Sequence, residues 1–329
     1  MSDLPLVTVI MPIRNEERYI ERSVASVLAQ DYPSDRTEVL VVDGMSTDHT
    51  RDIIAVFPVR VLDNPAHIVS TALNIGLIQT RGEIIIRIDG HCEIPPNHIR
   101  RCVELLQETG ADCVGGCIVT AGDTWIAQAI AAALSSPFGV GTVAFRTGRA
   151  HPGYVDTVAF GAYRRETFER IGNFDEKLTR HQDYEFNLRL RQSGGKIYYT
   201  PDIKIRYYSR GTLRKLARQF FQYGFWKWRV TRANPQAFTW RHLAPSSLAL
   251  MVVLGALSSL AWTWARSAYA LLWLLYAASV LGASIYVSAR RGWRYLPILP
   301  LAFATIHLSW GLGFWWGVIH RRDSRSAAT

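Results

Sequence analysis

IIIRIDGHCEIPP, residues 84–96, carries the strongest structural signal in this sequence. Four of its first five residues are isoleucine, a β-branched residue typical of buried strands. The apolar run ends in Asp89, Gly90 and His91, with two prolines close behind. On an extended segment, side chains spaced i, i+2 point the same way, so Asp89 and His91 are expected to project together. Gly90 between them would let a ligand approach the backbone. The stretch therefore predicts a buried strand that ends in a ligand site.

Further strands and helices alternate on either side of this stretch. Continuous apolar runs predict strands at residues 6–13, 38–44, 59–62 and 83–89. Helices are predicted between them, at 17–30, from the capping residues Ser46-Thr47-Asp48 through Phe57, and at 67–79. This alternation is typical of an α/β domain with a mostly parallel sheet covered on both faces.

Polar residues stand where three of these strands end. They are Arg14-Asn15-Glu16, Asp43 and Asp89-Gly90-His91. Each group alone is equally typical of an ordinary turn. Because ligands collect at the carboxyl ends of strands in such sheets, the three together predict a pocket. One carboxylate and one imidazole suit Mn²⁺ or Mg²⁺ shared with substrate phosphates, whereas Zn²⁺ usually takes more protein ligands.

Charge and apolar content divide the chain of 329 residues in two. Residues 1–202 hold 26 acidic and 20 basic residues, a net charge of −6. Residues 203–329 hold 17 basic residues and one acid, Asp323, a net charge of +16. At 49% hydrophobic residues the chain can bury a core and leave material for a second region. Because the basic residues flank apolar segments and the first part is acidic, nucleic acid is not expected as a partner.

Three long apolar segments lie in the second part, at residues 243–265, 268–289 and 295–319. None contains Lys, Arg, Asp or Glu, and each matches the ~20 residues that cross a bilayer. Tryptophans gather near the segment ends, as they do at membrane interfaces: Trp262, Trp264, Trp293, Trp315 and Trp316. We therefore predict three transmembrane helices rather than three buried helices of a large globular core. A lone histidine in the third segment, His307, could meet a phosphate or a hydrogen-bond partner in the helix bundle.

A basic amphipathic helix is predicted just before these segments, at residues 211–229. Its apolar residues follow helical spacing: Leu213, Leu216, Ala217, Phe220, Gly224, Phe225 and Trp228. Such a helix is expected in the headgroup region of the membrane, with its cations toward anionic lipid. A helix that packs on a protein core would show the same periodicity. Residues 125–140 are apolar but too short to span, which predicts a packed helix or loop instead of a membrane span.

The order of several motifs resembles the family 2 glycosyltransferases with the GT-A fold. The stretches, in chain order, are VTVIMPIRNEERYIERSVASVLAQ, VLVVDGMSTDHT, ALNIGLIQTRGEIIIRIDGH, GAYRRETFERIGNFDEKL and HQDYEFNLRLRQSGGKIYYTP. The resemblance covers residues 6–205, and with the apolar segments attached the chain is similar to succinoglycan-type exopolysaccharide glycosyltransferases. It implies a GT-A catalytic domain at residues 1–205, an interfacial region at 206–242, a three-helix membrane region at 243–319 and a basic tail at 320–329.

The resemblance assigns a donor-binding role to residues at the strand ends. Asp43 matches the aspartate that hydrogen-bonds uracil, so UDP is the expected nucleotide. Asp89 and His91 fall on the D-x-D metal motif, with histidine where the second aspartate is usual. The remaining residues implied for binding of the nucleotide-sugar are Pro12, Asn15, Glu16, Gly161 and Ala162, with Arg164 and Arg165 as possible partners of the diphosphate.

The resemblance also implies the catalytic base and the reaction. Asp183 matches the aspartate of the E-D motif, although Gln182 stands where glutamate is common, and Glu185 is the reserve candidate. A positioned carboxylate that takes the proton of an acceptor hydroxyl gives a typical gain of about 10²–10⁴-fold. With a metal at Asp89 and His91 to neutralise the leaving diphosphate, one carboxylate is sufficient, and direct displacement inverts the anomeric centre.

The expected acceptor is a hydroxyl of a polyprenyl-diphosphate-linked glycan reached from the membrane surface. Gln219, Gln222 and Trp226 resemble part of the Q-x-x-R-W motif of processive polysaccharide synthases, but the spacing differs and the arginine is missing. A processive synthase, a polyprenyl-phosphate monosaccharide synthase and, in another class, a membrane transport or binding protein remain the alternatives.

The expected location is the plasma (inner) membrane, with several spans. No cleavable signal precedes the first strand, so the catalytic domain is expected in the cytosol, and its four cysteines are expected to be thiols. Three spans then place Arg266 outside, Arg290–Arg294 inside and the tail outside. The basic tail residues Arg321, Arg322 and Arg325 are on the disfavoured side in this topology. A third segment that re-enters the membrane is the alternative.

Overall fold

The computed structural model describes residues 4–148, 151–209 and 211–320. The chain forms two compact units. Unit 1 comprises Met1–Ala121 and Thr142–Tyr208, and unit 2 comprises Gly122–Gly141 and Ser209–Thr329. Unit 1 extends past the predicted boundary at residue 205, and the apolar stretch 122–141 belongs to unit 2. Most of the predicted tail, residues 321–329, lies outside the described residues.

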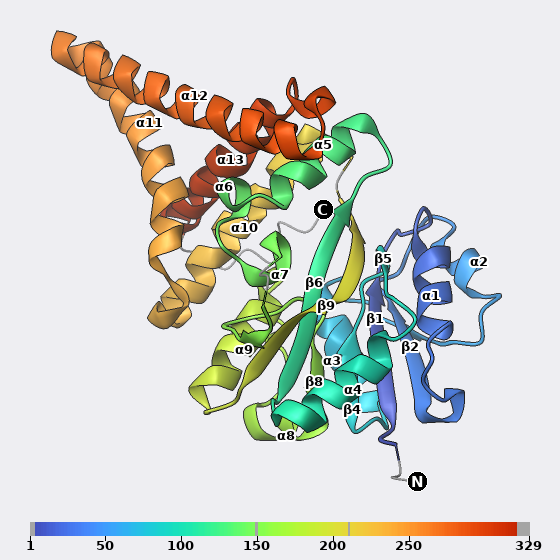
Figure 1. Cartoon of the computed structure of the whole chain (residues 1–329). Coiled ribbons are helices and arrows are strands. Elements are labelled where there is room, and N and C mark those ends of the chain that lie inside the picture. The colour runs from blue at the N-terminus through green and yellow to red at the C-terminus, as the bar shows by residue number, and fades with distance from the viewer. Residues whose placement is uncertain (1–3, 149–150, 210, 321–329) are drawn as a thin grey trace. The chain divides into compact units, whose positions relative to one another are not determined.

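Unit 1 is built around a nine-stranded mixed sheet with the order β3-β2-β1-β4-β8-β6-β9-β5, in which β7 also pairs with β9 (Figure 1). The strands are β1 (Val7–Ile13), β2 (Thr37–Asp43), β3 (Arg60–Asp63), β4 (Ile84–Arg87), β5 (Cys92–Glu93), β6 (Cys113–Ala121), β7 (Gly153–Tyr154), β8 (Ala162–Arg164) and β9 (Ile197–Tyr208). The first four strands are mutually parallel, as predicted. β8 runs antiparallel to its neighbours β4 and β6.

Helices cover the sheet of unit 1 and close two hydrophobic cores. They are α1 (Ile20–Leu28), α2 (Thr50–Ile54), α3 (Val69–Gln79), α4 (His98–Thr109), α7 (Ala144–Thr147), α8 (Arg165–Ile171) and α9 (Gln182–Gln192), with a 3-10 turn at Ser34–Arg36. β1 is buried along its whole length because it lies between β2 and β4 and is covered on both faces. Cys92, Cys102 and Cys113 are buried thiols and Cys117 is partly buried, in agreement with the sequence expectation.

Unit 2 is helical. Its helices are α5 (Trp125–Leu134), α6 (Pro137–Val140), α10 (Leu213–Ala233), α11 (Leu243–Ala261), α12 (Thr263–Arg291) and α13 (Leu299–Ile319), with 3-10 turns at Pro235–Ala237, Trp240–His242 and Trp293–Tyr295. α5, α10, α12 and α13 share one apolar core. His307 lies in this core, with its ring nitrogens 2.7 Å from the Phe138 carbonyl oxygen and 3.2 Å from the Tyr276 hydroxyl. It is therefore hydrogen-bonded within the bundle.

Two glycines allow α10 and α13 to approach closely. A Cβ on Gly313 would collide with the carbonyl oxygen of Phe221, and one on Gly224 would collide with that of Trp310. Gly317, one turn after Gly313, also faces the carbonyl oxygen of Phe225, but less tightly, since a Cβ there would lie 3.1 Å from it. Phe221 contacts Gly313 and Phe225 contacts Gly317, so the residue numbers of the contacting pairs increase together along the two helices. α10 and α13 therefore run side by side in the same direction. The predicted amphipathic helix thus packs its apolar side against the third apolar segment.

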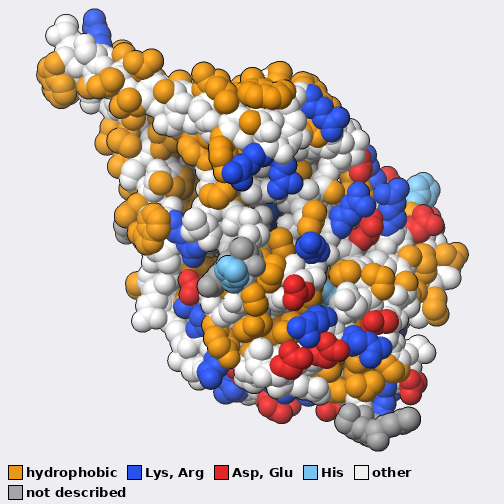
Figure 2. All heavy atoms as spheres, in the orientation of Figure 1, with side chains coloured by type: hydrophobic (Ala, Val, Ile, Leu, Met, Phe, Trp, Pro, Cys, Tyr) orange, Lys and Arg blue, Asp and Glu red, His pale blue; other side chains and the backbone are white. Residues whose placement is uncertain are grey.

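α11 and α12 form a helical hairpin joined at Trp262 (Figure 1). Among the described residues, they are the two helices long and apolar enough to cross a membrane, and only 17% of the residues in the most apolar window of each are buried. Figure 2 shows hydrophobic side chains over this arm. α13 does not meet the same criterion, so the prediction of three membrane spans is not confirmed. The second predicted span extends to Arg291 as one continuous helix.

Candidate active site

The carboxyl ends of β1, β2 and β4 lie at one edge of the sheet of unit 1. Ile13 of β1 pairs with Asp43 of β2, and the Ile88 amide just past β4 donates to the Ile10 carbonyl. Because the three strands are parallel, the residues that follow them are neighbours at this edge. The register places the three strand ends together at one edge, as predicted, and whether they form one site stays a prediction.

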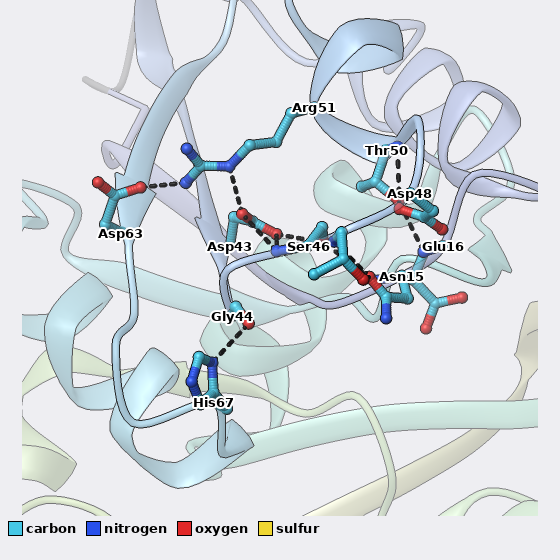
Figure 3. Close-up of polar contacts among 11 residues, drawn as sticks. Asn15, Glu16, Asp43, Gly44, Ser46, Asp48, Thr50, Arg51, Asp63 and His67 are labelled. Carbon is cyan, nitrogen blue, oxygen red and sulfur yellow. Dashed lines mark hydrogen bonds and ion pairs between the residues drawn. The ribbon is translucent and has the colours of Figure 1, made fainter.

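Asp43 is held by its own loop at this edge (Figure 3). Its side chain is fully buried and accepts hydrogen bonds from the Ser46 amide at 3.1 Å and the Ser46 hydroxyl at 2.5 Å. Arg51 Nε donates to the same carboxylate at 2.5 Å, and the guanidinium also pairs with Asp63. These two carboxylates beside it raise the pKa of Arg51. In this conformation Asp43 has no surface left for a nucleobase, so base binding requires the loop or Arg51 to move.

Asn15 and Glu16 fasten the end of β1 to the same loop (Figure 3). Asn15 adopts the left-handed conformation (φ 55°), donates its amide to the Ser46 hydroxyl and accepts from the Thr47 amide. The Glu16 amide donates to the Thr50 hydroxyl at 2.7 Å. Pro12 instead lies inside β1, opposite Val42, and is buried. Of the residues predicted to bind the nucleoside, Asn15 and Glu16 lie at the sheet edge and Pro12 is buried in β1, and a nucleoside-binding role stays a prediction.

Asp89 is paired with an arginine that sequence reasoning missed. Arg87 donates to Asp89 through Nε at 2.9 Å and through Nη2 at 3.1 Å. The Arg87 and Asp89 side chains are only 11% and 17% exposed. Burial alone would raise the pKa of the Asp89 carboxyl, but the adjacent guanidinium holds it below its ordinary value. Asp89 is thus kept as a carboxylate inside the protein.

His91 is held in a ligand-ready orientation by Glu16. Its Nδ1 lies 2.8 Å from Glu16 Oε1, and its ring packs edge-on against Tyr207. With the Nδ1 proton donated to this carboxylate, Nε2 carries the lone pair that a metal binds. The space over Gly90 is filled by the Ile13 and Glu16 side chains. The expectation that Gly90 leaves its backbone open to a ligand is therefore wrong, and the glycine serves the packing of Glu16.

Asp89 and His91 are the predicted ligands of a divalent cation, which would take its other ligands from a diphosphate. The set combines a buried carboxylate with an imidazole oriented by a second carboxylate, as in many metal sites. Within the described ranges no group of three or more His, Cys, Asp and Glu side chains could hold a metal. Two protein ligands suit Mn²⁺ or Mg²⁺ shared with phosphate oxygens.

Asp183 lies on the other side of Arg87. It stands in the first turn of α9, its Oδ1 accepts from the Tyr184 amide at 2.9 Å, and its Oδ2 lies 4.0 Å from Arg87 Nη1. The Asp183 side chain is 35% exposed, so a substrate can reach it. Glu185, the reserve candidate for the base, is bound through both oxygens to Arg189 at 2.6 and 3.0 Å. Arg189 also donates to two backbone carbonyls, so this pair fastens α9 to the preceding loop.

The structure separates the four residues predicted in and beside β8. The Gly161 carbonyl accepts from the Arg87 amide, and Ala162 pairs with Ile86, so both lie near the end of β4 that carries Asp89. Arg164 pairs with Ile84 at the opposite end of β4. Its side chain donates to the carbonyls of Leu106 and Ala111.

Arg165 likewise donates to the carbonyls of Thr80 and Gly82, which precede β4. A role for Arg164 or Arg165 in binding the diphosphate is therefore not supported. The reason is the antiparallel direction of β8, which carries its last residues away from the edge where Asp89 lies.

The residues predicted on the acceptor side lie together on α10 in unit 2. Gln219 donates to the Tyr223 hydroxyl at 2.8 Å. Gln222 and Trp226 are partly buried on the same helix, and Arg229 stacks over the Trp226 ring at 5.5 Å. Their role in acceptor binding stays a prediction.

Arg87 and Arg51 contact the predicted site residues Asp89 and Asp43, and sequence reasoning missed both arginines. A signal for Arg87 exists, because a cation in the run IIIRID must find a partner when its strand is buried, and Asp89 stands at i+2 on the same side. Arg51 gives no such signal. It stands on α2, eight residues after Asp43, and only the fold brings the two together.

Comparisons with known proteins agree with this architecture. The model of the family described as "Glycosyl transferase family 2" matches residues 8–172. The succinoglycan biosynthesis protein ExoA of Rhizobium meliloti (strain 1021) is 30% identical over 314 residues, which cover 93% of each chain. A second relative, from Methanococcus voltae, is 28% identical over 231 residues, or 66% of this chain and 71% of its own. It is the dolichyl N-acetyl-alpha-D-glucosaminyl phosphate 3-beta-D-2,3-diacetamido-2,3-dideoxy-beta-D-glucuronosyltransferase.

Solved structures show the same fold at low sequence identity. The mannosyltransferase PcManGT from Pyrobaculum calidifontis, solved with GDP-Man and Mn²⁺, superposes with a TM-score of 0.57 at 22% identity. The match covers 93% of this chain and 88% of that one. GalNAc-T7 with UDP, GalNAc and Mn²⁺ gives a TM-score of 0.50 at 18% identity, covering 72% of this chain and 52% of the other. Both structures show the same fold as this chain.

Proposed function

This chain belongs to glycosyltransferase family 2, and from that premise we propose that it is a membrane-bound, inverting and metal-dependent hexosyltransferase. It moves a sugar from a nucleotide-sugar, with UDP as the first candidate, to a hydroxyl of a polyprenyl-diphosphate-linked glycan. The product belongs to exopolysaccharide or cell-surface glycan synthesis. The observation that carries the proposal is the arrangement at one sheet edge, where Arg87 stands between the predicted metal ligand Asp89 and the predicted base Asp183.

The donor is bound by its nucleotide and its diphosphate. The loop fastened by Asn15 and Glu16 supports a nucleoside site at the ends of β1 and β2, and Asp43 beneath it would reach a base only after the loop or Arg51 moves. Asp89 and His91 would hold the divalent cation, and the bound cation would supply the Lewis acid for the leaving diphosphate. Gly161 and Ala162, at the other side of β4, are proposed to lie beside the donor sugar.

Asp183 acts as the general base. Its partly exposed carboxylate accepts the proton of the acceptor hydroxyl as the oxygen attacks the anomeric carbon. No protein nucleophile is required, so one displacement inverts the configuration and an α-linked donor gives a β-linkage. Glu185 is not available for this step, because Arg189 occupies both of its oxygens.

The acceptor class is supported by the names of relatives and by unit 2. Besides the dolichyl-linked enzyme of Methanococcus voltae, a relative from Serratia proteamaculans (strain 568) is named for undecaprenyl phosphate and is 26% identical over 186 residues. The exposed apolar arm of α11 and α12 supports attachment to the membrane that carries such acceptors. Gln219, Gln222 and Trp226 on α10 are proposed to face the acceptor.

We propose two membrane spans in place of the three predicted from the sequence. α10 carries six basic residues and cannot cross a bilayer at acceptable cost. α13 runs beside α10 and packs against its backbone, so it is held at the membrane surface. α11 and α12 then form a hairpin that starts and ends in the cytosol, with Arg266 at its outer tip. This topology also places the basic tail residues Arg321, Arg322 and Arg325, which lie outside the described residues, on the favoured side.

The proposed function is tested by offering radiolabelled nucleotide-sugars to the purified full-length protein with a lipid-linked acceptor extract. One donor is expected to label the lipid fraction, and its nucleotide is expected to protect the protein against heat. The matched control is the Asp183→Asn variant, which should show the protection without the transfer. Transfer of sugar to polyprenyl phosphate itself would indicate a monosaccharide synthase, and neither protection nor transfer with any donor would contradict the proposal.

A further inference from the structure

Arg87 is a buried cation that stands between two functional carboxylates. Arg87 is the last residue of β4. Asp89 follows it at i+2, so the two side chains point to the same face of the sheet and meet. The guanidinium is almost completely enclosed, and its carbon lies 5.9 Å from the centre of the Phe160 ring. Phe160 precedes Gly161 in the predicted sugar loop and adopts the left-handed conformation (φ 53°). Arg87 therefore contacts the predicted metal ligand, sugar loop and base together.

The three nitrogens of the guanidinium divide between the two carboxylates. Nε and Nη2 donate to the two oxygens of Asp89 at 2.9 and 3.1 Å. Nη1 faces Asp183 Oδ2 at 4.0 Å, which is too long for a hydrogen bond. Nη1 is shielded from solvent and has no hydrogen-bond partner. A buried donor without a partner is costly, so a small movement of Arg87 or Asp183 that closes this gap is favourable.

We propose that Arg87 is a positioning residue that couples metal binding at Asp89 to the placement of the Asp183 carboxylate, an inference that rests on the function proposed above. A divalent cation on Asp89 repels the guanidinium and competes for the same carboxylate. The guanidinium of Arg87 then weakens its contact with Asp89 and forms a closer contact between Nη1 and Asp183. The base is thereby fixed when the metal that carries the donor diphosphate is present. Coupling of this kind is reciprocal, so changes at Asp183 also alter metal binding.

The coupling predicts an effect on metal binding that a purely structural arginine would not produce. Loss of the guanidinium removes the cation that competes with the metal for Asp89. Mn²⁺ should then bind more tightly even though the base is no longer held and turnover falls. If Arg87 only supported the fold, its loss would weaken Mn²⁺ binding and turnover together.

The experiment uses the full-length protein and Mn²⁺ alone as the probe, titrated calorimetrically without sugar donor. Arg87→Gln is expected to bind Mn²⁺ about threefold or more tightly, and Arg87→Lys, which keeps the charge, to bind it as wild type does. In transfer assays Arg87→Gln should lose about tenfold or more in kcat with little change in the donor KM, and Arg87→Lys should recover part of this loss. The matched control is Arg170→Gln, which breaks an ion pair with Asp112 that involves none of the predicted site residues. This variant should change neither the Mn²⁺ affinity nor kcat.

A second variant keeps the test decisive if Arg87→Gln does not fold. Asp183→Asn alters a partly exposed side chain and leaves Arg87 bound to Asp89 alone, so Mn²⁺ binding should weaken about threefold. Unchanged Mn²⁺ affinity in Asp183→Asn, or weaker binding in Arg87→Gln, would overturn the proposal, and so would a wild-type protein that binds no Mn²⁺. If the Mn²⁺ results hold while no donor is transferred, the coupling stands and the proposed transferase reaction fails.

Discussion

Units 1 and 2 contain similar apolar segments with opposite surroundings. In unit 1, Ile84, Ile85 and Ile86 of β4 are at most 5% exposed, because helices and neighbouring strands cover them. In unit 2, Leu257, Leu260 and Leu274 on the α11–α12 hairpin are 60–78% exposed. An exposed apolar area of this extent on a folded chain marks a surface that contacts a membrane or another protein. The comparison teaches that unit 1 covers its apolar strands with its own chain, whereas the α11–α12 hairpin leaves its apolar residues uncovered, as the proposed membrane spans require.

The two units also differ in how their charges are paired. In unit 1, buried or half-buried arginines are matched by carboxylates, as in Arg51 with Asp43, Arg87 with Asp89 and Arg189 with Glu185. Unit 2 has one acidic residue in its described part, Asp123, against many basic residues. The surplus cations of α10 and of the end of α12 therefore suit anionic headgroups beside the apolar hairpin.

The largest expected effect is an all-or-none change in cysteine labelling, which tests the proposed two-span topology of unit 2. In intact cells, a single cysteine placed after Arg325 of a cysteine-free version should not react with a membrane-impermeant reagent. It should react once the membrane is opened, because α13 is expected to stay on the cytosolic side with α10. The matched control, Arg266→Cys at the hairpin tip, should react in intact cells. Labelling of the tail cysteine in intact cells would restore three spans.

The next effect concerns the carboxylate at the edge of unit 1 that remains open to substrate. At saturating Mn²⁺, Asp183→Asn should lower kcat by about 10²-fold or more with donor binding preserved, because it removes the base but keeps the shape. Glu185→Gln is the matched control two residues away. It should reduce the stability of α9 through loss of the Arg189 pair and leave kcat within a few-fold. A reversed pattern would move the base to Glu185.

The sequence predicts unit 1 better than unit 2 for a physical reason. The sequence located β1 to β4 because a short apolar run bounded by turn residues, in a water-soluble domain, most often forms a buried strand. For residues 295–319, an apolar run of sufficient length fits either lipid or a neighbouring helix. The choice depends on Gly224 and Gly313, whose close approach joins two segments about ninety residues apart. Pattern alone does not show such a contact.

The sequence predicted which strand ends lie at one edge of the sheet, and it missed the side-chain pairs that join residues far apart in the chain. The positions of Asp43 and Asp89 at this edge follow from the parallel pairing of β1 with β2 and β4, and their roles stay predictions. Arg164 was misplaced because the antiparallel direction of β8 is not visible in a strand of three residues. The link between Glu16 and His91 was missed because it joins two strand ends that are 75 residues apart.

A smaller effect in unit 1 is expected from this Glu16–His91 link. Glu16→Gln should weaken Mn²⁺ binding by about 10–100-fold, since the carboxylate that orients a metal-binding histidine and raises its basicity is lost. Calorimetric titration of the full-length protein measures the change, and Glu21→Gln, exposed on α1, is the matched control. An unchanged Mn²⁺ affinity in Glu16→Gln would remove His91 from the metal site.

The smallest effect is on thermal stability. It tests whether the ammonium group of Lys227, which is buried inside unit 2, loses its proton in the folded protein. Lys227 on α10 is only 2% exposed, and burial, with Arg241 nearby, lowers the pKa of its ammonium group from 10.5 to about 7. The unfolded chain therefore binds a proton between about pH 7 and pH 10.5 that the folded chain does not. Stability rises with pH across this window, at most by roughly 1.4 kcal/mol per pH unit, and the full penalty of burial is present below pH 7.

Lys227→Met should remove this pH dependence. At pH 6.5 the variant should unfold at a higher temperature than wild type, and the gap in Tm should narrow by about 3 °C per unit as the pH rises toward 10. Thermal unfolding of the detergent-solubilised protein, followed by its helical signal, measures both curves. Lys215→Met, at an exposed position of the same helix, should keep the wild-type pH dependence. Parallel curves for wild type and Lys227→Met would mean that Lys227 stays charged in the folded protein, held by contacts within unit 2.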